Sequence, residues 1–532
     1  MDTKSVHTIQ SIQLQEIRDH NKHIVQPPKF TAQAIKNYFG SRFRSLFVPK
    51  EELEQYTWAD IYNPFSALRE VSLREWNFFF LGFWAWTWDA FDFFTVSLNI
   101  TNIAEALDSS VKDISWGITL VLMLRTVGAI IFGLIGDTRG RKWPYIINLA
   151  LLSVIQIGTG FVQTYKQFLA VRALFGIAMG GLFGICAAEA LSDAPRKARG
   201  IMSGIFQEGY AFGYLLAVVF QRAIADTSSW RNVFYFSAGV GVIFMVWRFF
   251  SPETDSFLRQ KARMEETAAA GGQGGSKVAA FKSQARKAMK QYWLIVIYCV
   301  LMMSGFNFSS HGSQDLYPTM LKNQYQFSAD KSTVANVAAN LGACAGGIFV
   351  AHMSTFIGRR LAIILATILC AAVIYPWAFI PNAGSAFAFQ FGIQGAWGVV
   401  PIHLSELSPP QFRSFVTGVA YQLGNLCSSA SSTIEATIGE RFPISGKGPD
   451  VYDYGKTMAI FMACVLVYQL IIIFIGPENR GADLGIERDD ILDEDAYEDD
   501  DELVEGKKSG EASVIMKPEV IHNEGKSVAN KV

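Results

Sequence analysis

Long apolar runs separated by short polar loops make up most of the chain between residues 76 and 476. Each run holds roughly 20 residues, the length with which a helix crosses a hydrocarbon core of about 30 Å. Twelve runs can be counted, at residues 77–99, 114–134, 143–162, 168–188, 201–220, 232–250, 293–311, 333–354, 361–380, 386–403, 415–437 and 456–476. The pattern predicts an all-α membrane protein with twelve transmembrane helices.

A polar stretch in the middle of the chain divides the twelve runs into two groups of six. Its glycine-rich part, residues 268–275, lacks the side chains to build a packed element, so we expect a flexible linker. We therefore predict five regions: a cytoplasmic N-terminal region (1–75), a first six-helix bundle (76–250), a cytoplasmic linker (251–291), a second six-helix bundle (292–476) and an acidic, disordered cytoplasmic tail (477–532).

Basic residues gather in the loops that follow the even-numbered runs: Arg139, Arg141, Lys142, Arg196, Lys197, Arg199, Arg359, Arg360 and Arg413. Loops rich in Lys and Arg face the cytoplasm, which places both termini there and predicts a multi-pass membrane protein. Two of these basic turns, Gly140–Lys142 and Gly358–Arg360, occupy matching places in the two halves. Parallel six-helix repeats with a binding site between them are typical of secondary transporters.

Composition excludes several other classes of protein. Only 17% of the 532 residues are charged, against about 25% in soluble domains. The net charge of -1 offers no basic surface for a nucleic acid. Hydrolase, zinc-protease and P-loop motifs are absent, so we expect no enzyme, no ATP-driven pump, no cofactor and no metal. The cysteines lie singly within apolar runs and are predicted to be small core residues: Cys186, Cys299, Cys344, Cys370, Cys427 and Cys464.

The loop after the second run resembles the Gly-x-x-x-Asp-Arg-x-Gly-Arg-Arg motif of the major facilitator superfamily. Here it reads from Gly133 to Lys142, with Thr138 at the position that is usually basic; Thr355 replaces the aspartate in the second copy. The resemblance covers about residues 70–480 and implies two six-helix pseudo-repeats around a central cavity. We expect four residues of these two loops to act in gating: Asp137, Arg141, Arg359 and Arg360.

One polar face runs along the seventh apolar run. At 100° per residue, five polar side chains fall within an arc of about 140°: Asn307, Ser310, His311, Gln314 and Asp315. The spacing of His311 and Asp315 lets the imidazole ring reach the carboxylate. The alternative is a helix that runs out into water and ends at Pro318. Five polar groups that include an ionisable pair are more than such a helix end requires, so we favour the interpretation that this face lines a binding site.

The same stretch resembles the Asn-x-x-(Ser/Thr)-His-x-x-Gln-Asp-x-x-x-Thr motif of the Jen-type carboxylate:proton symporters of fungi. Every fixed position matches, and the last of them is Thr319. Members of that family import short monocarboxylates such as lactate and pyruvate, or dicarboxylates such as succinate and malate, together with protons. The resemblance implies that the matched residues take part in substrate translocation.

Arg125 lies in the middle of the second run, where a cation without an anionic partner is costly. The planar guanidinium suits a carboxylate, which belongs either to a substrate or to Asp89 or Asp92 of the first run. These two acids are also candidates for carrying a proton. Glu208 in the fifth run is a further protonatable carboxyl group.

Amide side chains occupy corresponding places in the fifth and eleventh runs. Gln207 and Gln422 could hydrogen-bond a substrate, and hydrogen bonding between helices is the equal alternative. His352 and His403 lie near the basic loops, where a role in gating or at an interface is favoured over ligand binding. Arg172 is interpreted as structural.

Together these features predict a secondary transporter that imports short-chain carboxylates with protons across the plasma membrane by alternating access. The alternatives are a proton-coupled carrier of sugars or amino acids, and a nutrient receptor that no longer transports. The expected partners are the carboxylate, protons and the lipid bilayer. Lysines of the acidic tail, such as Lys507 and Lys508, could engage ubiquitin and the endocytic machinery.

Overall fold

The computed structural model describes residues 30–49, 53–54, 56–109, 111–225, 229–258, 261–262, 277–409, 412–439, 441–444 and 452–481. Within these ranges the regular structure is helical, apart from one isolated bridge between Pro443 and Tyr452. The glycine-rich run and the tail lysines discussed above lie outside the described residues.

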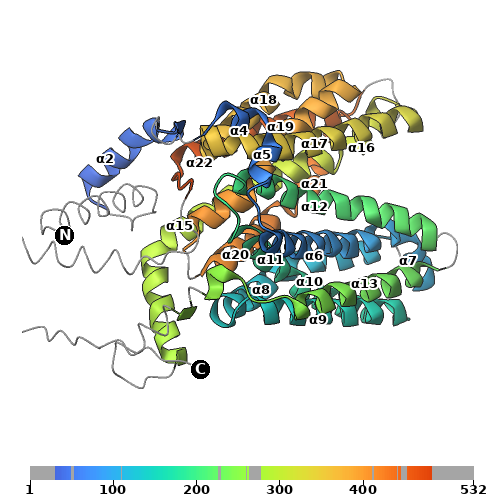
Figure 1. Cartoon of the computed structure of the whole chain (residues 1–532). Coiled ribbons are helices and arrows are strands. Elements are labelled where there is room, and N and C mark those ends of the chain that lie inside the picture. Colours follow the sequence, from blue (N-terminus) through green and yellow to red (C-terminus); the bar gives the residue numbers. More distant parts are fainter. Residues whose placement is uncertain are drawn as a thin grey trace, which may run out of the picture. The chain divides into compact units, whose positions relative to one another are not determined.

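The first half of the chain folds into helices that match the first six apolar runs (Figure 1). Their bounds are α6 (Leu73–Leu98), α8 (Val111–Arg139), α9 (Lys142–Phe161), α10 (Tyr165–Gly180) with α11 (Leu182–Leu191), α12 (Arg199–Phe220) and α13 (Trp230–Phe250). The fourth run is thus divided at Gly181. The short α7 (Ile100–Ala106) follows α6, and a π turn, η2 (Gln221–Ala225), follows α12.

The second half repeats this arrangement. Its bounds are α15 (Lys277–Gln314), α17 (Ala329–Ile357), α18 (Arg359–Phe379), α19 (Ala383–Leu407), α20 (Arg413–Ser428) with α21 (Ser431–Gly439) and α22 (Tyr454–Ile475). The one-turn α16 (Tyr317–Thr319) and the π turn η3 (Met320–Gln324) connect α15 to α17. α15 begins at Lys277, inside the stretch that we assigned to the linker.

Eight helical segments of the described residues are long and apolar enough to cross a membrane. The other four predicted runs correspond to α6, α12, α19 and the pair α20–α21, which are also helical. Three cysteines are fully buried as expected, but Cys427 and Cys464 are exposed, which corrects their assignment to the core. Cys464 lies on the outer face of α22, which carries other exposed apolar residues such as Val467.

We use the term basic-loop end for the helix ends next to Arg139–Lys142, Arg196–Arg199, Arg359–Arg360 and Arg413. Here the two bundles pack closely: α8 contacts α20, and α12 contacts α17 and α19. Gly204 of α12 permits this approach, because a Cβ atom there would lie 2.5 Å from the carbonyl oxygen of Gly347. The Ser203 hydroxyl donates to the Gly398 carbonyl at 2.8 Å and accepts from the Ile402 amide at 3.1 Å.

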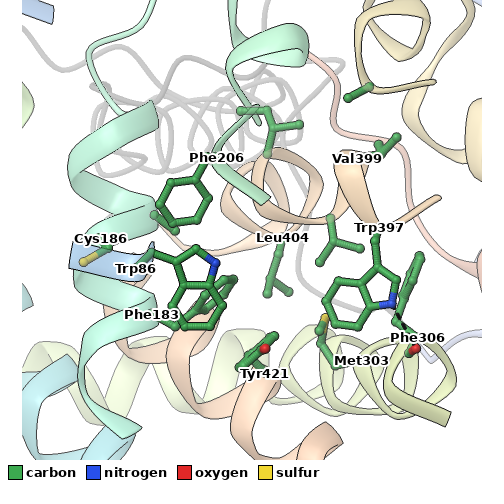
Figure 2. Packing of buried hydrophobic residues seen from close by; sticks show 14 of the residues in the cluster. Trp86, Phe183, Cys186, Phe206, Met303, Phe306, Trp397, Val399, Leu404 and Tyr421 are labelled. Atoms are coloured by element: carbon green, nitrogen blue, oxygen red, sulfur yellow. Dashed lines mark hydrogen bonds between the residues drawn. The ribbon is translucent and has the colours of Figure 1, made fainter. Parts of the chain in front are cut away.

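Aromatic side chains from both halves meet between the bundles (Figure 2). Phe183 of α11 stacks on Tyr421 of α20 with ring centroids 4.1 Å apart, and Trp86 of α6 meets Tyr421 edge-on at 5.8 Å. The Trp397 indole of α19 donates to the Phe306 carbonyl of α15 at 3.1 Å, which satisfies its buried N–H. This aromatic cluster joins α6 and α11 of the first half to α20 of the second half.

The N-terminal segment lies against the basic-loop end through α2 (Ala32–Ser41), the turn η1 (Arg44–Leu46), α4 (Trp58–Tyr62) and α5 (Pro64–Leu68). Arg42 donates to the Gly476 carbonyl at 2.8 Å, and Arg360 donates to the Ser45 hydroxyl at 2.8 Å. Hydrogen bonds from the backbone N–H and the hydroxyl of Thr57 lower the pKa of Asp60, which caps α4.

The first residues of the predicted tail are also structured. Glu478 accepts hydrogen bonds from the amides of Arg359 and Arg360 at 3.3 and 2.9 Å, and so caps the start of α18. Arg480 donates to the Thr355 carbonyl at 2.6 Å. The described chain therefore remains packed on the second bundle as far as Gly481, beyond the boundary at 477 that we assigned to the tail.

Candidate functional site

Arg125 is buried in the middle of α8, with 1% of its surface exposed. Its Nη2 and Nε donate to the Met179 sulfur at 2.6 and 3.2 Å, and its Cζ lies 4.9 Å from the centre of the Phe93 ring. A thioether is a weak acceptor. Among the described residues, no carboxylate forms an ion pair with this guanidinium. Arg125 is thus a buried cation whose hydrogen-bond partners, Met179 and Tyr210, are both uncharged groups.

Asp89 of α6 is the acid that acts electrostatically on Arg125. It is 2% exposed, and neither carboxylate oxygen has a hydrogen-bond partner among the described residues. Tyr210 of α12 interacts with both Arg125 and Asp89, and also with Asp315 of α15. Tyr210 therefore links the buried charges of the first half to the polar face of the second half.

Asp92, one turn further along α6, has different surroundings. It accepts a hydrogen bond from the Ser237 hydroxyl of α13 and interacts with Gln156 of α9 and Arg172 of α10. Arg172 in turn donates to Gln156 at 3.0 Å. Asp92 is therefore part of a network that joins four helices of the first bundle, whereas Asp89 faces Arg125.

The polar face of α15 contains the expected contact between His311 and Asp315, with 3.2 Å between Nδ1 and Oδ2. Their side chains are 31% and 38% exposed, so the pair is accessible to solvent. Asn307 is buried and donates to the Met303 carbonyl of its own helix at 2.9 Å. Thr319 lies beyond this face, in α16.

Hydrogen bonds tie the rest of this face to α19. Gln314 donates to Gln390 Oε1 at 3.1 Å, and Gln394 donates to the Ser310 hydroxyl at 3.4 Å. A helix end that merely runs out into water would not need partners on a neighbouring helix. The face is a built polar surface between α15 and α19.

Gln207 and Glu208 of α12 and Gln422 of α20 differ in their hydrogen-bond partners. Gln207 is buried, and its carbonyl oxygen has no hydrogen-bond partner among the described residues. Gln422 is buried and accepts from the Asn425 amide at 3.4 Å. Glu208 hydrogen-bonds Cys344 of α17 and so lies at the contact between the bundles.

Three residues of this region were not singled out from the sequence: Gln390, Gln394 and Glu435. The two glutamines are one helical turn apart in an apolar run, a signal that the sequence does contain. Glu435 of α21 is fully buried, and both its oxygens lack a partner among the described residues.

At the basic-loop end, Asp137 joins the two bundles directly. Its Oδ1 and Oδ2 accept hydrogen bonds from the amides of Ser414 and Phe415 at 3.0 and 2.8 Å. These amides belong to the first turn of α20, which has no side-chain cap of its own. A carboxylate at a helix N-terminus satisfies free N–H groups and the helix dipole. Asp137 therefore holds the closed arrangement of this end.

Each of the three expected gating arginines forms hydrogen bonds within its own half, and Arg360 also donates to Ser45 of the N-terminal segment. Arg141 donates to the Ala188 carbonyl at 2.9 Å. Arg359 makes two hydrogen bonds to the Glu406 carboxylate, at 3.0 and 3.1 Å, in a buried ion pair. Arg360 donates to the Ile473 carbonyl at 2.8 Å.

Comparison with known proteins places this architecture in a family. Residues 63–489 match the family described as "Sugar (and other) transporter". A carboxylic acid transporter protein homolog of Saccharomyces cerevisiae is 38% identical over 474 residues, which cover 86% of this chain and 76% of the relative. The cis,cis-muconate transport protein of Acinetobacter baylyi is 23% identical over 382 residues, covering 69% and 88%.

Solved structures share the same fold. A proton:xylose symporter of the major facilitator superfamily superposes with a TM-score of 0.60 at 15% identity, covering 77% of this chain and 98% of that chain. The human organic anion transporter MFSD10 gives 0.54 at 14% identity, covering 75% and 99%. The chain belongs to the sugar (and other) transporter family of the major facilitator superfamily. The predicted fold class is confirmed, and the protein is a multi-pass membrane transporter.

Proposed function

We propose that this protein imports short-chain carboxylates with protons across the plasma membrane. The observation that carries the proposal is the environment of Arg125, a buried guanidinium that contacts a thioether and an aromatic ring and forms no ion pair with a carboxylate of the described residues. A carboxylate substrate is the anion that its planar donors fit best. The name of the yeast relative, a carboxylic acid transporter homolog, supports the same substrate class.

In this proposal Arg125 holds the substrate carboxylate in a bidentate contact. Asn307, Ser310 and Gln314 of α15 orient the substrate from the second half. Gln207 and Gln422 hydrogen-bond its remaining polar groups. The Gln207 carbonyl oxygen, which has no partner among the described residues, can accept a hydrogen bond from a hydroxyl group of the substrate.

Proton coupling is assigned to titratable groups around the same centre. His311 and Asp315 form the solvent-accessible pair, and imidazole titrates near physiological pH. At low external pH, charged His311 strengthens anion binding, and at the higher cytosolic pH it releases the proton and the substrate. Asp89, Asp92 and Glu208 are the further carboxyl groups that can take up a proton.

Alternating access follows from the packing at the basic-loop end. With this end cytoplasmic, as its charge indicates, the described arrangement is closed towards the cytoplasm. Opening requires that Asp137 leave the amides of α20 and that the contacts of Ser203 with α19 separate. Arg141, Arg359 and Arg360 hold the loops that move with each bundle.

The decisive experiment measures uptake of labelled lactate, succinate and glucose by cells that express the protein, at two external pH values. We expect uptake of a carboxylate that rises at the lower pH, with no uptake of glucose. Glucose uptake would favour the sugar carrier instead. Surface-delivered protein with no uptake of any solute would favour a nutrient receptor.

A narrower proposal concerns the number of carboxylates on the substrate. We place Gln207 at the far end of the substrate from Arg125, because an amide can donate to a second carboxylate at little desolvation cost. This favours succinate or malate over lactate. Gln207→Phe should then depress dicarboxylate uptake and spare or improve lactate uptake. An unchanged ratio of the two rates, measured in parallel, would place Gln207 outside the binding site.

A further inference from the structure

Glu435 is a buried acid that none of the roles above uses. It lies in α21, which follows α20 at the end of the second bundle remote from the basic loops. It is 0% exposed, and neither carboxylate oxygen has a hydrogen-bond partner among the described residues. An ionised carboxylate in such a place is costly, and a purely structural role would supply it with donors. Its position therefore calls for a functional explanation.

The neighbours of Glu435 come from the two helices that pack against α21, which are α15 and α22. From α15, Asp315 acts on Glu435 electrostatically, and His311 is paired with Asp315. The start of α22 carries Lys456, whose Nζ lies 4.5 Å from the centre of the Phe442 ring. It also carries Asp453, which accepts from Gln324 at 2.8 Å, and Tyr454, which packs near Gly439. No cation among the described residues forms an ion pair with Glu435.

We propose that Glu435 is a proton-binding residue of the transport cycle, coupled to Asp315. This inference rests on the proposed function and extends it to a residue outside the motif of α15. An enclosed carboxyl group beside a second carboxylate resists ionisation, so Glu435 is the acid that holds a bound proton. Protonation forms an O–H bond on Glu435 with a proton delivered by water, and release returns that proton to water and leaves one more negative charge at the site.

The two acids differ in access to water, which gives each its own task. Asp315 is 38% exposed beside His311 and exchanges protons with the solution. Glu435 is enclosed and retains the proton while the transporter changes state. The enclosed acid therefore keeps its charge state through the step in which the two bundles move.

The test uses the full chain reconstituted in liposomes and labelled succinate or lactate. Glu435→Gln keeps the shape of the side chain but cannot bind a proton. We expect it to lose most uptake driven by a pH gradient and to flatten the pH profile. Exchange of labelled for unlabelled substrate at equal pH should remain near the wild-type rate, and Glu435→Asp should restore part of the gradient-driven uptake. Glu105→Gln, an exposed acid of α7, is the matched control.

Two results would overturn the inference: wild-type gradient-driven uptake by Glu435→Gln, or an equal loss of gradient-driven uptake and exchange, which indicates a structural role. Failure of the proposed function looks different, because the wild-type protein itself would then show neither gradient-driven uptake nor exchange with any carboxylate.

If Glu435→Gln does not fold, the wild-type protein is labelled with a hydrophobic carbodiimide, a reagent that modifies protonated carboxyl groups. Peptide mass spectrometry should find Glu435 modified at acid pH and less at alkaline pH; equal labelling at both would contradict the proposal.

Discussion

At the scale of single residues, burial without partners separates the functional charges from the structural ones. Arg172 has Gln156 and the nearby Asp92, and Arg359 has Glu406, so both are satisfied by the protein. Arg125 contacts the Met179 sulfur and Tyr210, and it forms no ion pair with a carboxylate of the described residues. Since a buried cation without an anion is unfavourable, the substrate is its natural partner.

Arg125→Lys tests this directly, because lysine keeps the charge and loses the planar pair of donors. A hydrogen bond to a charged group contributes about 1.5–3 kcal/mol, so initial uptake at low substrate should fall by about 10- to 100-fold. Uptake is normalised to the amount of protein at the cell surface, and Arg441→Lys at an exposed site is the control. Near-normal uptake by properly delivered Arg125→Lys would contradict the assignment.

The His311–Asp315 pair gives a second prediction at this scale. His311→Ala removes the titrating ring, and Asp315→Asn removes its partner while keeping the size of the side chain. Each should disable pH-driven uptake, and Asp315→Asn should also shift the pH profile. The measurement is uptake across a series of external pH values. An unchanged rate and optimum in both variants would show that this face of α15 is only solvated.

At the scale of elements, one helix is capped by a residue of the other bundle. α20 lacks a side-chain cap, and Asp137 supplies two acceptors to its first turn. In the second half Thr355 takes the corresponding place beside α12, where a Cβ atom on Gly200 would lie 2.2 Å from its hydroxyl. Asp137 is charged and Thr355 is neutral, so the two contacts stabilise the closed basic-loop end unequally.

Asp137→Asn should loosen this end. Loss of a helix-capping carboxylate costs about 1 kcal/mol, which raises the population of the open form by about fivefold. Ser203→Cys reports the change, since this position is buried between the bundles in the closed form. Its alkylation by a membrane-permeant maleimide should accelerate in the Asp137→Asn background and not with Asp330→Asn. An unaltered alkylation rate would show that other contacts hold the end closed.

At the scale of the whole molecule, the length and apolar character of the runs predicted the twelve helices, and helical periodicity predicted the polar face of α15. The partners of that face could not be predicted, because Gln390 and Gln394 reach it only through the packing of α15 on α19. Likewise, spacing along α6 cannot tell that Asp89 faces Arg125 while Asp92 faces Arg172. Contacts between side chains of different helices depend on the tertiary structure, so the sequence of one apolar run cannot predict them.

The contact between the bundles leads to the last prediction. Gly204 lies so close to Gly347 that any larger side chain meets backbone atoms, which cannot move aside as a flexible side chain can. Gly204→Leu should therefore hold the basic-loop end apart and favour the form that opens there. Spin labels at exposed Arg139 and Ile475 should report a longer distance, and carboxylate uptake should fall, because the closed form is needed to load substrate from the other side. Gly158→Leu, at a position with open space around it, is the control. An unchanged distance in Gly204→Leu would mean that the bundles do not separate along this surface.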